Sequence, residues 1–152
     1  MSTTLTWRDN DETMVIRTDF AHETEWTEIQ LAIVEPQTED DFMADVRFVD
    51  DRSCDGLTVP QLLELVPADS DEVLVFIVDT ETLTHPDRPI LAVCVWDYEE
   101  GGGDNGKGPD YGSTFRVIPS EMWAVENNIS LANMDWEDFA DNVDGDGIFR
   151  GF

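Results

Sequence analysis

Basic residues are scarce in this sequence. Eight Lys and Arg stand against 35 Asp and Glu among 152 residues, so the formal net charge is −27, and Lys107 is the one lysine. A surface of this charge repels nucleic-acid phosphates and anionic lipid headgroups, which makes nucleic acids and membranes poor partners. It attracts basic proteins and cations. Salt adaptation, or a well-solvated surface without any partner, would produce the same acidity.

Cysteine and long apolar segments are scarce as well. Cys54 and Cys94 are the two cysteines, and they lack the C-x-x-C spacing of zinc and redox motifs. Free cysteines without a disulfide framework are typical of a reducing cytoplasm. No apolar run approaches the roughly 18 residues of a membrane helix, and no signal-peptide pattern opens the sequence. These features predict a cytoplasmic protein.

Histidine is limited to His22 and His85. Neither has a Cys or His partner at the spacing of a zinc site, and no nucleophile signature accompanies them. We therefore predict no metal and no cofactor, and we take each histidine as a surface residue.

Five runs of residues predict β-strands. The run EVLVFIVD is apolar between its first and last residues, which is typical of a central strand buried on both faces. The run FMADVRFVDD alternates apolar and polar residues, as a strand with one buried face does. The predicted strands cover residues 13–20, 42–51, 72–79, 90–98 and 113–118.

Four further segments predict helices or turns. Trp26, Ile29 and Ile33 have the spacing of one helix face. Thr58 and Gln61 form a T-x-x-Q capping box at the start of another helix. The predicted helical segments cover residues 21–35, 58–66, 120–128 and 135–143.

The order of these elements predicts an α/β fold. Strands and helices alternate in the first half, which favours three parallel strands with right-handed helical crossovers. The last two strands follow as a hairpin-like pair. We therefore expect a mixed five-stranded sheet with helices packed on it. Residues 1–12 form a polar lead-in, and residues 13–152 have the size of a single domain.

The tail DNVDGDGIFRGF has the beginning of an EF-hand calcium loop. Placing Gly147 at position 6 puts Asn142, Asp144 and Asp146 at positions 1, 3 and 5. The bidentate Glu of position 12 is missing, because the sequence ends at Phe152. We expect a turn with Asp-Gly chemistry here rather than a tight calcium site.

The segment GGGDNGKG, residues 101–108, matches the front of a phosphate-binding loop. Such a loop needs Ser or Thr after its lysine, followed by a helix, but Gly108 and Pro109 follow Lys107. The segment therefore predicts a connection between two strands and not a phosphate site.

Acidic residues follow the first three predicted strands: Asp19, then Asp50 with Asp51, then Asp79. If these strands are parallel, the acids gather at one sheet edge, where open α/β sheets bind ligands. Arg17 stands two residues before Asp19 and points to the same face of an extended strand. These five residues are the candidate ligand or partner edge. The alternative is that the acids cap turns and the following helices.

Several stretches together resemble a known family. They are VIRTDF, FVDD, LTVPQLLELVP, TFRVIPSEMWAVENNISLANMDWEDFAD and GIFRGF, which span most of residues 14–152. They are similar to an uncharacterised family of small acidic bacterial proteins, a domain of unknown function that is frequent in actinobacteria. The family has no assigned activity, so the resemblance implies no functional residue.

These observations favour a non-catalytic acidic protein that binds a basic protein partner, as immunity proteins and antitoxins do. The alternative is a small enzyme or accessory enzyme that uses the strand-end carboxylates to hold a cation or to move protons.

The net charge predicts a dependence of stability on salt. We expect the melting temperature to rise between low salt and about 1 M NaCl, because screening relieves the repulsion among the acids. Thermal unfolding followed by circular dichroism measures this. A melting temperature that stays constant over the range would contradict the idea that charge repulsion limits the stability of this fold.

Overall fold

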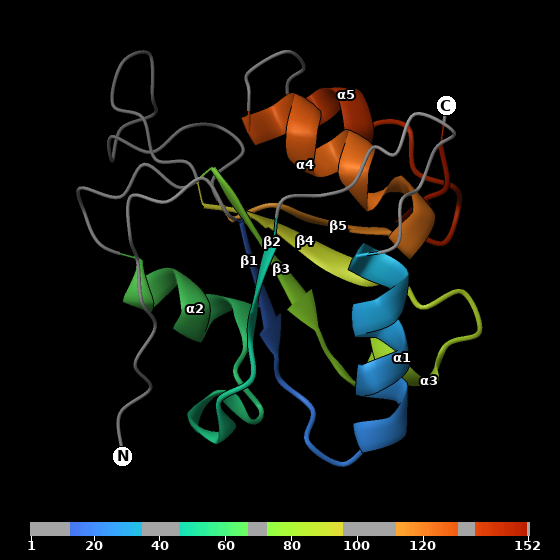
Figure 1. Ribbon diagram of the computed structural model, residues 1–152. Helices are drawn as coiled ribbons and strands as arrows, with labels where there is room; N and C mark the ends of the chain where they lie inside the picture. Colours follow the sequence, from blue (N-terminus) through green and yellow to red (C-terminus); the bar gives the residue numbers. More distant parts are fainter. Residues whose placement is uncertain (1–12, 35–45, 67–72, 96–111, 131–135, 152) are drawn as a thin grey trace.

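One mixed β-sheet with helices on both sides forms the protein (Figure 1). The structure, a computed structural model, describes residues 13–34, 46–66, 73–95, 112–130 and 136–151. Its strands are β1 (Thr13–Arg17), β2 (Val46–Val49), β3 (Leu74–Val78), β4 (Ile90–Cys94), β5 (Thr114–Val117) and β6 (Ile148–Phe149). Its helices are α1 (Glu23–Val34), α2 (Val59–Leu65), α3 (Thr80–Thr84), α4 (Met122–Ser130) and α5 (Trp136–Ala140), with 3-10 turns η1 (Arg52–Cys54) and η2 (Pro119–Glu121).

The strand order is β2-β1-β3-β4-β5-β6. Strand β1 pairs in parallel with β2 and with β3, so the predicted parallel arrangement of the first three strands is confirmed. Strand β4 is antiparallel to β3 and to β5, and β6 is parallel to β5. All described strands except β4 therefore run in one direction, and their carboxyl ends lie at one edge of the sheet. We call this edge the carboxyl edge.

The prediction of five strands was wrong, because the sheet has six. The sixth strand pairs Ile148 with Arg116 and Phe149 with Val117. It follows a turn in which Gly147 adopts a positive φ of 83°, a conformation that glycine reaches without strain. Two apolar residues after an Asp-Gly turn are too few to give a periodic signal, which is why the strand was not predicted.

Helices α1 and α2 cover opposite faces of the sheet. Strand β2 lies on one side of β1 in the sheet, and β3 lies on the other side. Two crossovers of the same hand in opposite directions place their helices on opposite faces. The face under α1, α4 and α5 is called the α1 face here, and the face under α2 and η1 is called the α2 face.

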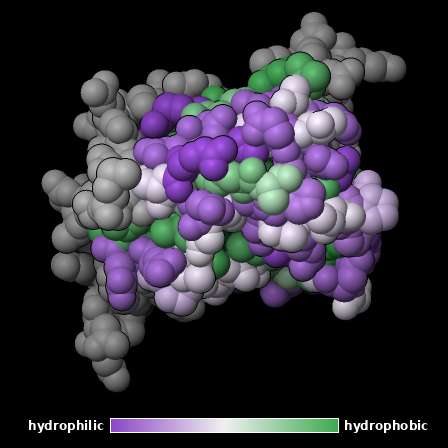
Figure 2. Space-filling model, turned by 90° about the horizontal axis from the view of Figure 1, so that it is seen from below, coloured by the Kyte–Doolittle hydropathy of each residue, from purple (hydrophilic) through white to green (hydrophobic). Residues whose placement is uncertain are grey.

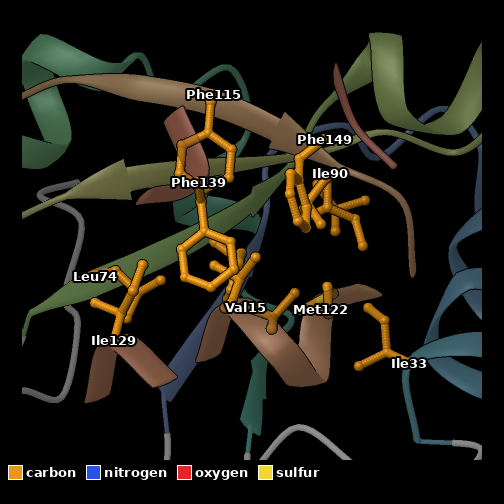
Figure 3. Close-up of a cluster of buried hydrophobic side chains, with 14 of the residues drawn as sticks. Val15, Ile33, Leu74, Ile90, Phe115, Met122, Ile129, Phe139 and Phe149 are labelled. Atoms are coloured by element: carbon orange, nitrogen blue, oxygen red, sulfur yellow. The ribbon is translucent and has the colours of Figure 1, made fainter. Parts of the chain in front are cut away.

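The core on the α1 face is the larger one. Alternate strand residues enter it, among them Val15 and Phe76, and the predicted face of α1 with Trp26, Ile29 and Ile33 packs on them. Figure 3 shows strand and helix side chains filling the space between the sheet and the helices on this face. The intervening residues of β1 and β3 enter the smaller core on the α2 face, which contains Met14, Ile16, Cys54, Leu62, Val75, Ile77, Val93 and Val95.

Local signals in the sequence fix several element ends. The capping box of α2 is present: the Gln61 amide donates to Thr58 Oγ1 at 3.3 Å, and the Thr58 amide donates to Gln61 Oε1 at 3.0 Å. In the predicted helical segment 135–143 Trp136 and Phe139 are buried, although α5 ends at Ala140. The lead-in 1–12 and the glycine-rich segment 101–108 lie outside the described residues. No helix in the described ranges combines the length and apolarity needed to cross a membrane.

The central position of β3 predicts a large effect of truncating its core residue. Phe76 is fully buried, so we expect Phe76→Ala to lower the free energy of unfolding by about 3–5 kcal/mol. Denaturant unfolding measures the change. The control is Leu31→Ala on the exposed side of α1, which should change stability by less than about 0.5 kcal/mol. Similar losses in the two variants would contradict the assignment of the core.

Candidate functional site at the carboxyl edge

The carboxyl edge brings together the ends of distant chain segments. Asp19 follows β1, Asp50 and Asp51 follow β2, and Asp79 follows β3. Strands β1 and β3 are the point where the strand order reverses, the position at which open α/β sheets bind ligands. Figure 2 views the molecule from the side toward which β1 and β3 run, and polar residues cover most of its coloured surface.

The predicted site residues are divided between the two faces of the sheet. Arg17 stands in register with Val78, which belongs to the core on the α1 face. Asp51 caps the turn η1, whose Cys54 lies in the core on the α2 face. Asp79 binds Arg116, which is in register with Leu91 on the α2 face. The structure therefore forms two separate groups from the five residues, because adjacent strand residues point to opposite faces.

Arg17 is the centre of the group on the α1 face. Its side chain is only 2% exposed. The guanidinium donates from Nε to the Asp19 carbonyl at 2.9 Å, from Nη2 to Glu23 Oε2 at 2.7 Å and from Nη1 to Asp50 Oδ1 at 3.3 Å. These acceptors come from the end of β1, the start of α1 and the end of β2. One buried charge thus fixes three segments to one another.

Aromatic rings cover the same guanidinium. The Arg17 Cζ atom lies 4.4 Å from the ring centroid of Phe20 and 5.4 Å from that of Trp26. The Cζ atom of Arg52 lies 5.5 Å from the ring centroid of Phe20. The rings attract the cation through their negative faces and exclude water from its ion pairs. This surrounding explains how the charge is tolerated inside the fold.

Asp19 is nearly buried and accepts three hydrogen bonds. The Ala21 amide donates to Oδ1 at 2.7 Å, and Thr80 Oγ1 donates to Oδ2 at 2.5 Å. His22 Nδ1 lies 2.9 Å from Oδ2, and because an ionised carboxylate only accepts, Nδ1 carries the proton. Burial raises the pKa of Asp19, but the bonds from Thr80, Ala21 and His22 outweigh it, and the pKa lies below its usual value.

Asp51 has a local role. Its carboxylate accepts a hydrogen bond from the Ser53 amide at 2.9 Å and caps η1. The bond lowers the pKa of Asp51. The adjacent Asp50 points to Arg17 instead. For these residues the structure supplies the capping and pairing that the alternative interpretation expected, and their role toward a partner stays a prediction.

Asp79 is the centre of the group on the α2 face. Arg116 binds it in a bidentate manner, with Nη1 to Oδ1 at 3.0 Å and Nη2 to Oδ2 at 2.8 Å. Asp79 also caps α3 through the Thr82 amide at 3.1 Å. Glu81 Oε2 lies 3.2 Å from Arg116 Nε. Burial raises the pKa of Asp79, but the hydrogen bonds from Arg116 and Thr82 lower it by more than burial raises it. The carboxyl is therefore more acidic than usual.

The tail forms a third group around Arg150, which directly follows β6. Its guanidinium binds Asp144 at 2.7 Å, Asp146 at 2.9 Å and Asp87 at 2.9 Å. Two of the acids that fitted the calcium pattern thus bind an arginine. Hydrogen bonds from Arg150 lower the pKa of Asp146. Nearby, Arg88 pairs with Glu28 at 3.4 Å and donates to the Leu83 carbonyl.

The arrangement has a clear chemical character. In the described ranges no three His, Cys, Asp or Glu residues are grouped so that they could hold a metal ion. The carboxyls of Asp19, Asp51 and Asp79 have lowered pKa values, so they are ionised at neutral pH and act as acceptors rather than proton donors.

Several residues of this edge were missed by the sequence analysis. Arg116 and Arg150 are the main ones, together with Glu23 and Thr80. Arg116 is a charged residue within the predicted strand 113–118. A charge at such a position could have indicated a side chain that reaches the end of the strand. Its partner Asp79 is 37 positions away in the sequence, and only the order of β3, β4 and β5 brings the two together.

The comparison with protein families gives one decisive match. The model of a domain of unknown function, DUF6924, matches residues 12–152. The chain belongs to the DUF6924 family. The resemblance to an uncharacterised family noted in the sequence is thus confirmed. No curated protein gives a significant match to this chain.

The ion pair between Asp79 and Arg116 predicts a measurable contribution to stability. Asparagine also caps helices well, so Asp79→Asn removes mainly the charge. We expect it to lower the free energy of unfolding by about 2 kcal/mol, because Arg116 loses its bidentate carboxylate and keeps Glu81 as a charged acceptor. Glu64→Gln on the exposed side of α2 is the matched control and should leave stability unchanged within about 0.5 kcal/mol.

The same variant tests the pH dependence. The pKa of Asp79 in the folded protein lies below its ordinary value of 3.8. Its stabilisation is therefore complete above that value and is lost as the pH falls through the folded pKa. The wild-type protein should lose more stability than Asp79→Asn between about pH 5 and pH 2. Parallel curves for the two proteins would show that Asp79 has no lowered pKa.

Proposed function

We propose that this DUF6924 protein is a non-catalytic acidic protein that binds a basic protein partner, in the manner of an immunity protein or an antitoxin. We further propose that residues 13–152 act as one domain and that the protein works in the cytoplasm. Cys54 and Cys94, which are both free and buried, support a reducing compartment.

One observation carries the binding proposal: in the ion pairs of the carboxyl edge the arginine lies inside and the carboxylates that it holds extend outward, whereas Arg52 is exposed. The side chain of Arg17 is 2% exposed, whereas its partner Glu23 is 75% exposed. Arg116 is 17% exposed, and Glu81 is 55% exposed. The same order, with the arginine inside, holds for the other pairs. Their acids are Asp50, Asp79, Glu28, Asp87, Asp144 and Asp146.

This order leaves negative charge for a partner. Arg17, Arg88, Arg116 and Arg150 together hold eight carboxylates. The carboxylates therefore exceed the guanidinium groups in number, and most of them keep exposed surface. Because each is already held by an arginine, a lysine or arginine of a partner would bind it with little further loss of side-chain entropy. Charge complementarity of this kind accelerates association and selects the partner.

A small enzyme is the second candidate, and one observation favours it. The buried Asp19 orients His22 through Nδ1, as the carboxylate of a catalytic dyad does, at the reversal of the strand order. Among the described residues, however, neither a hydroxyl nor a thiol is hydrogen-bonded to His22. Thr80 bonds to Asp19 instead. The same contacts also hold the turn between β1 and α1, and we therefore prefer the binding function.

A binding experiment with two charge-matched variants tests the proposed function. The edge variant carries Glu23→Gln, Asp50→Asn and Glu81→Gln, and the control variant carries Glu64→Gln, Glu137→Gln and Asp141→Asn. The probe is a 16-residue peptide of lysine and alanine, measured by calorimetry in about 0.15 M salt. We expect about tenfold weaker binding to the edge variant and less than about twofold weaker binding to the control.

The change in net charge is the same in both variants, so net charge alone cannot separate them. Equal weakening would mean that the peptide responds only to the overall charge and would contradict a binding surface at the carboxyl edge. Thermal unfolding of both variants checks that each is folded at the temperature of the measurement.

A further inference from the structure

Helix α1 carries an apolar pair that the core does not use. Leu31 is 65% exposed and Val34 is 42% exposed, and they are the exposed large hydrophobic side chains of the described residues. They stand three apart, which places them on one side of the helix. The opposite side, with Trp26, Ile29 and Ile33, is buried against the sheet.

Acidic residues extend this pair into a stripe. Glu28 precedes Leu31 by three positions and Glu23 lies at the first turn, both with their side chains exposed. The helix contains three glutamates and no basic residue. Its last turn therefore lacks the cation that the helix dipole would favour there. From Glu23 to Val34 the stripe is about 16 Å long. It begins at the carboxyl edge and ends at the apolar pair.

We infer that this outward stripe of α1 is the docking surface for a basic amphipathic helix of the partner. The inference rests on the proposed function and specifies its partner. Apolar side chains of the bound helix cover Leu31 and Val34, and its lysines or arginines meet Glu23 and Glu28. A helix on an apolar stripe is a common mode of recognition, in which residues one turn apart serve as anchors.

The charge of the chain decides between the occupants of this surface. A second copy of the chain would bring another 27 negative charges and three further glutamates to the same place. A neutral apolar segment would add no counter-charge to the acidic half of the stripe, the exposed carboxylates of Glu23 and Glu28, whose ion-pair partners among the described residues are only Arg17 and Arg88. A basic amphipathic helix satisfies both halves.

Two peptides of equal charge test the inference. One is a 16-residue amphipathic helix of lysine and leucine, and the other is the lysine and alanine peptide, which lacks large apolar anchors. The apolar variant of the protein carries Leu31→Ser and Val34→Ser. We expect it to bind the leucine peptide about tenfold more weakly than the wild type and to bind the alanine peptide equally well. The conservative variant Leu31→Met with Val34→Ile should keep the wild-type affinity for both.

Each other outcome has a defined meaning. Unchanged binding of the leucine peptide to the apolar variant would overturn the docking surface, while the proposed function would still stand if the edge variant remains weakened. Equal weakening for both peptides would show a general effect of the substitutions and would also overturn it. If analytical ultracentrifugation shows that the wild type is a dimer and the apolar variant a monomer, the surface binds a second copy of the chain and the inference is overturned.

Discussion

Arg17 carries a positive charge at the end of β1, in a place that water hardly reaches. Burying a guanidinium is costly unless all of its donors are satisfied. Here the acceptors come from Asp19 at the end of β1, from Asp50 after β2 and from Glu23 in the first turn of α1. The position of β2 and α1 relative to β1 thus depends on this one side chain. Removing any acceptor would leave a buried charge partly unpaired.

The same principle orders the other half of the carboxyl edge. Arg116 of β5 reaches across β4 to Asp79 after β3, and it also donates to the Pro89 carbonyl just before β4. Arg150 connects the tail after β6 with Asp87 in the connection between α3 and β4. In a chain with so few cations, each of these arginines joins segments that are distant in sequence. The arginines of these pairs are less exposed than the carboxylates that they hold.

Periodicity and local chemistry predicted much of this architecture, and long-range geometry accounts for what they missed. The apolar run of β3, the buried face of α1 and the Thr58–Gln61 capping box are local patterns, and each appears as expected. Strand β6 has two residues, too few for a pattern. The face on which each site residue lies depends on whether its position along the strand is odd or even. It also depends on the register in which neighbouring strands pair. Arg116 became part of the edge only through the order of the strands.

The lowered pKa values of the acids at this edge bear on one catalytic role, that of a general acid. A general acid requires a pKa raised toward neutrality, whereas hydrogen bonds from Thr80, Ser53 and Arg116 lower the pKa values of Asp19, Asp51 and Asp79. A carboxylate that caps a turn or holds an arginine is stabilised in its ionised form. That same property keeps the edge negative at neutral pH, as a surface for a basic partner requires. Structural and binding roles therefore demand the ionised state of these residues, which a general base would share, and only a general acid demands the protonated state.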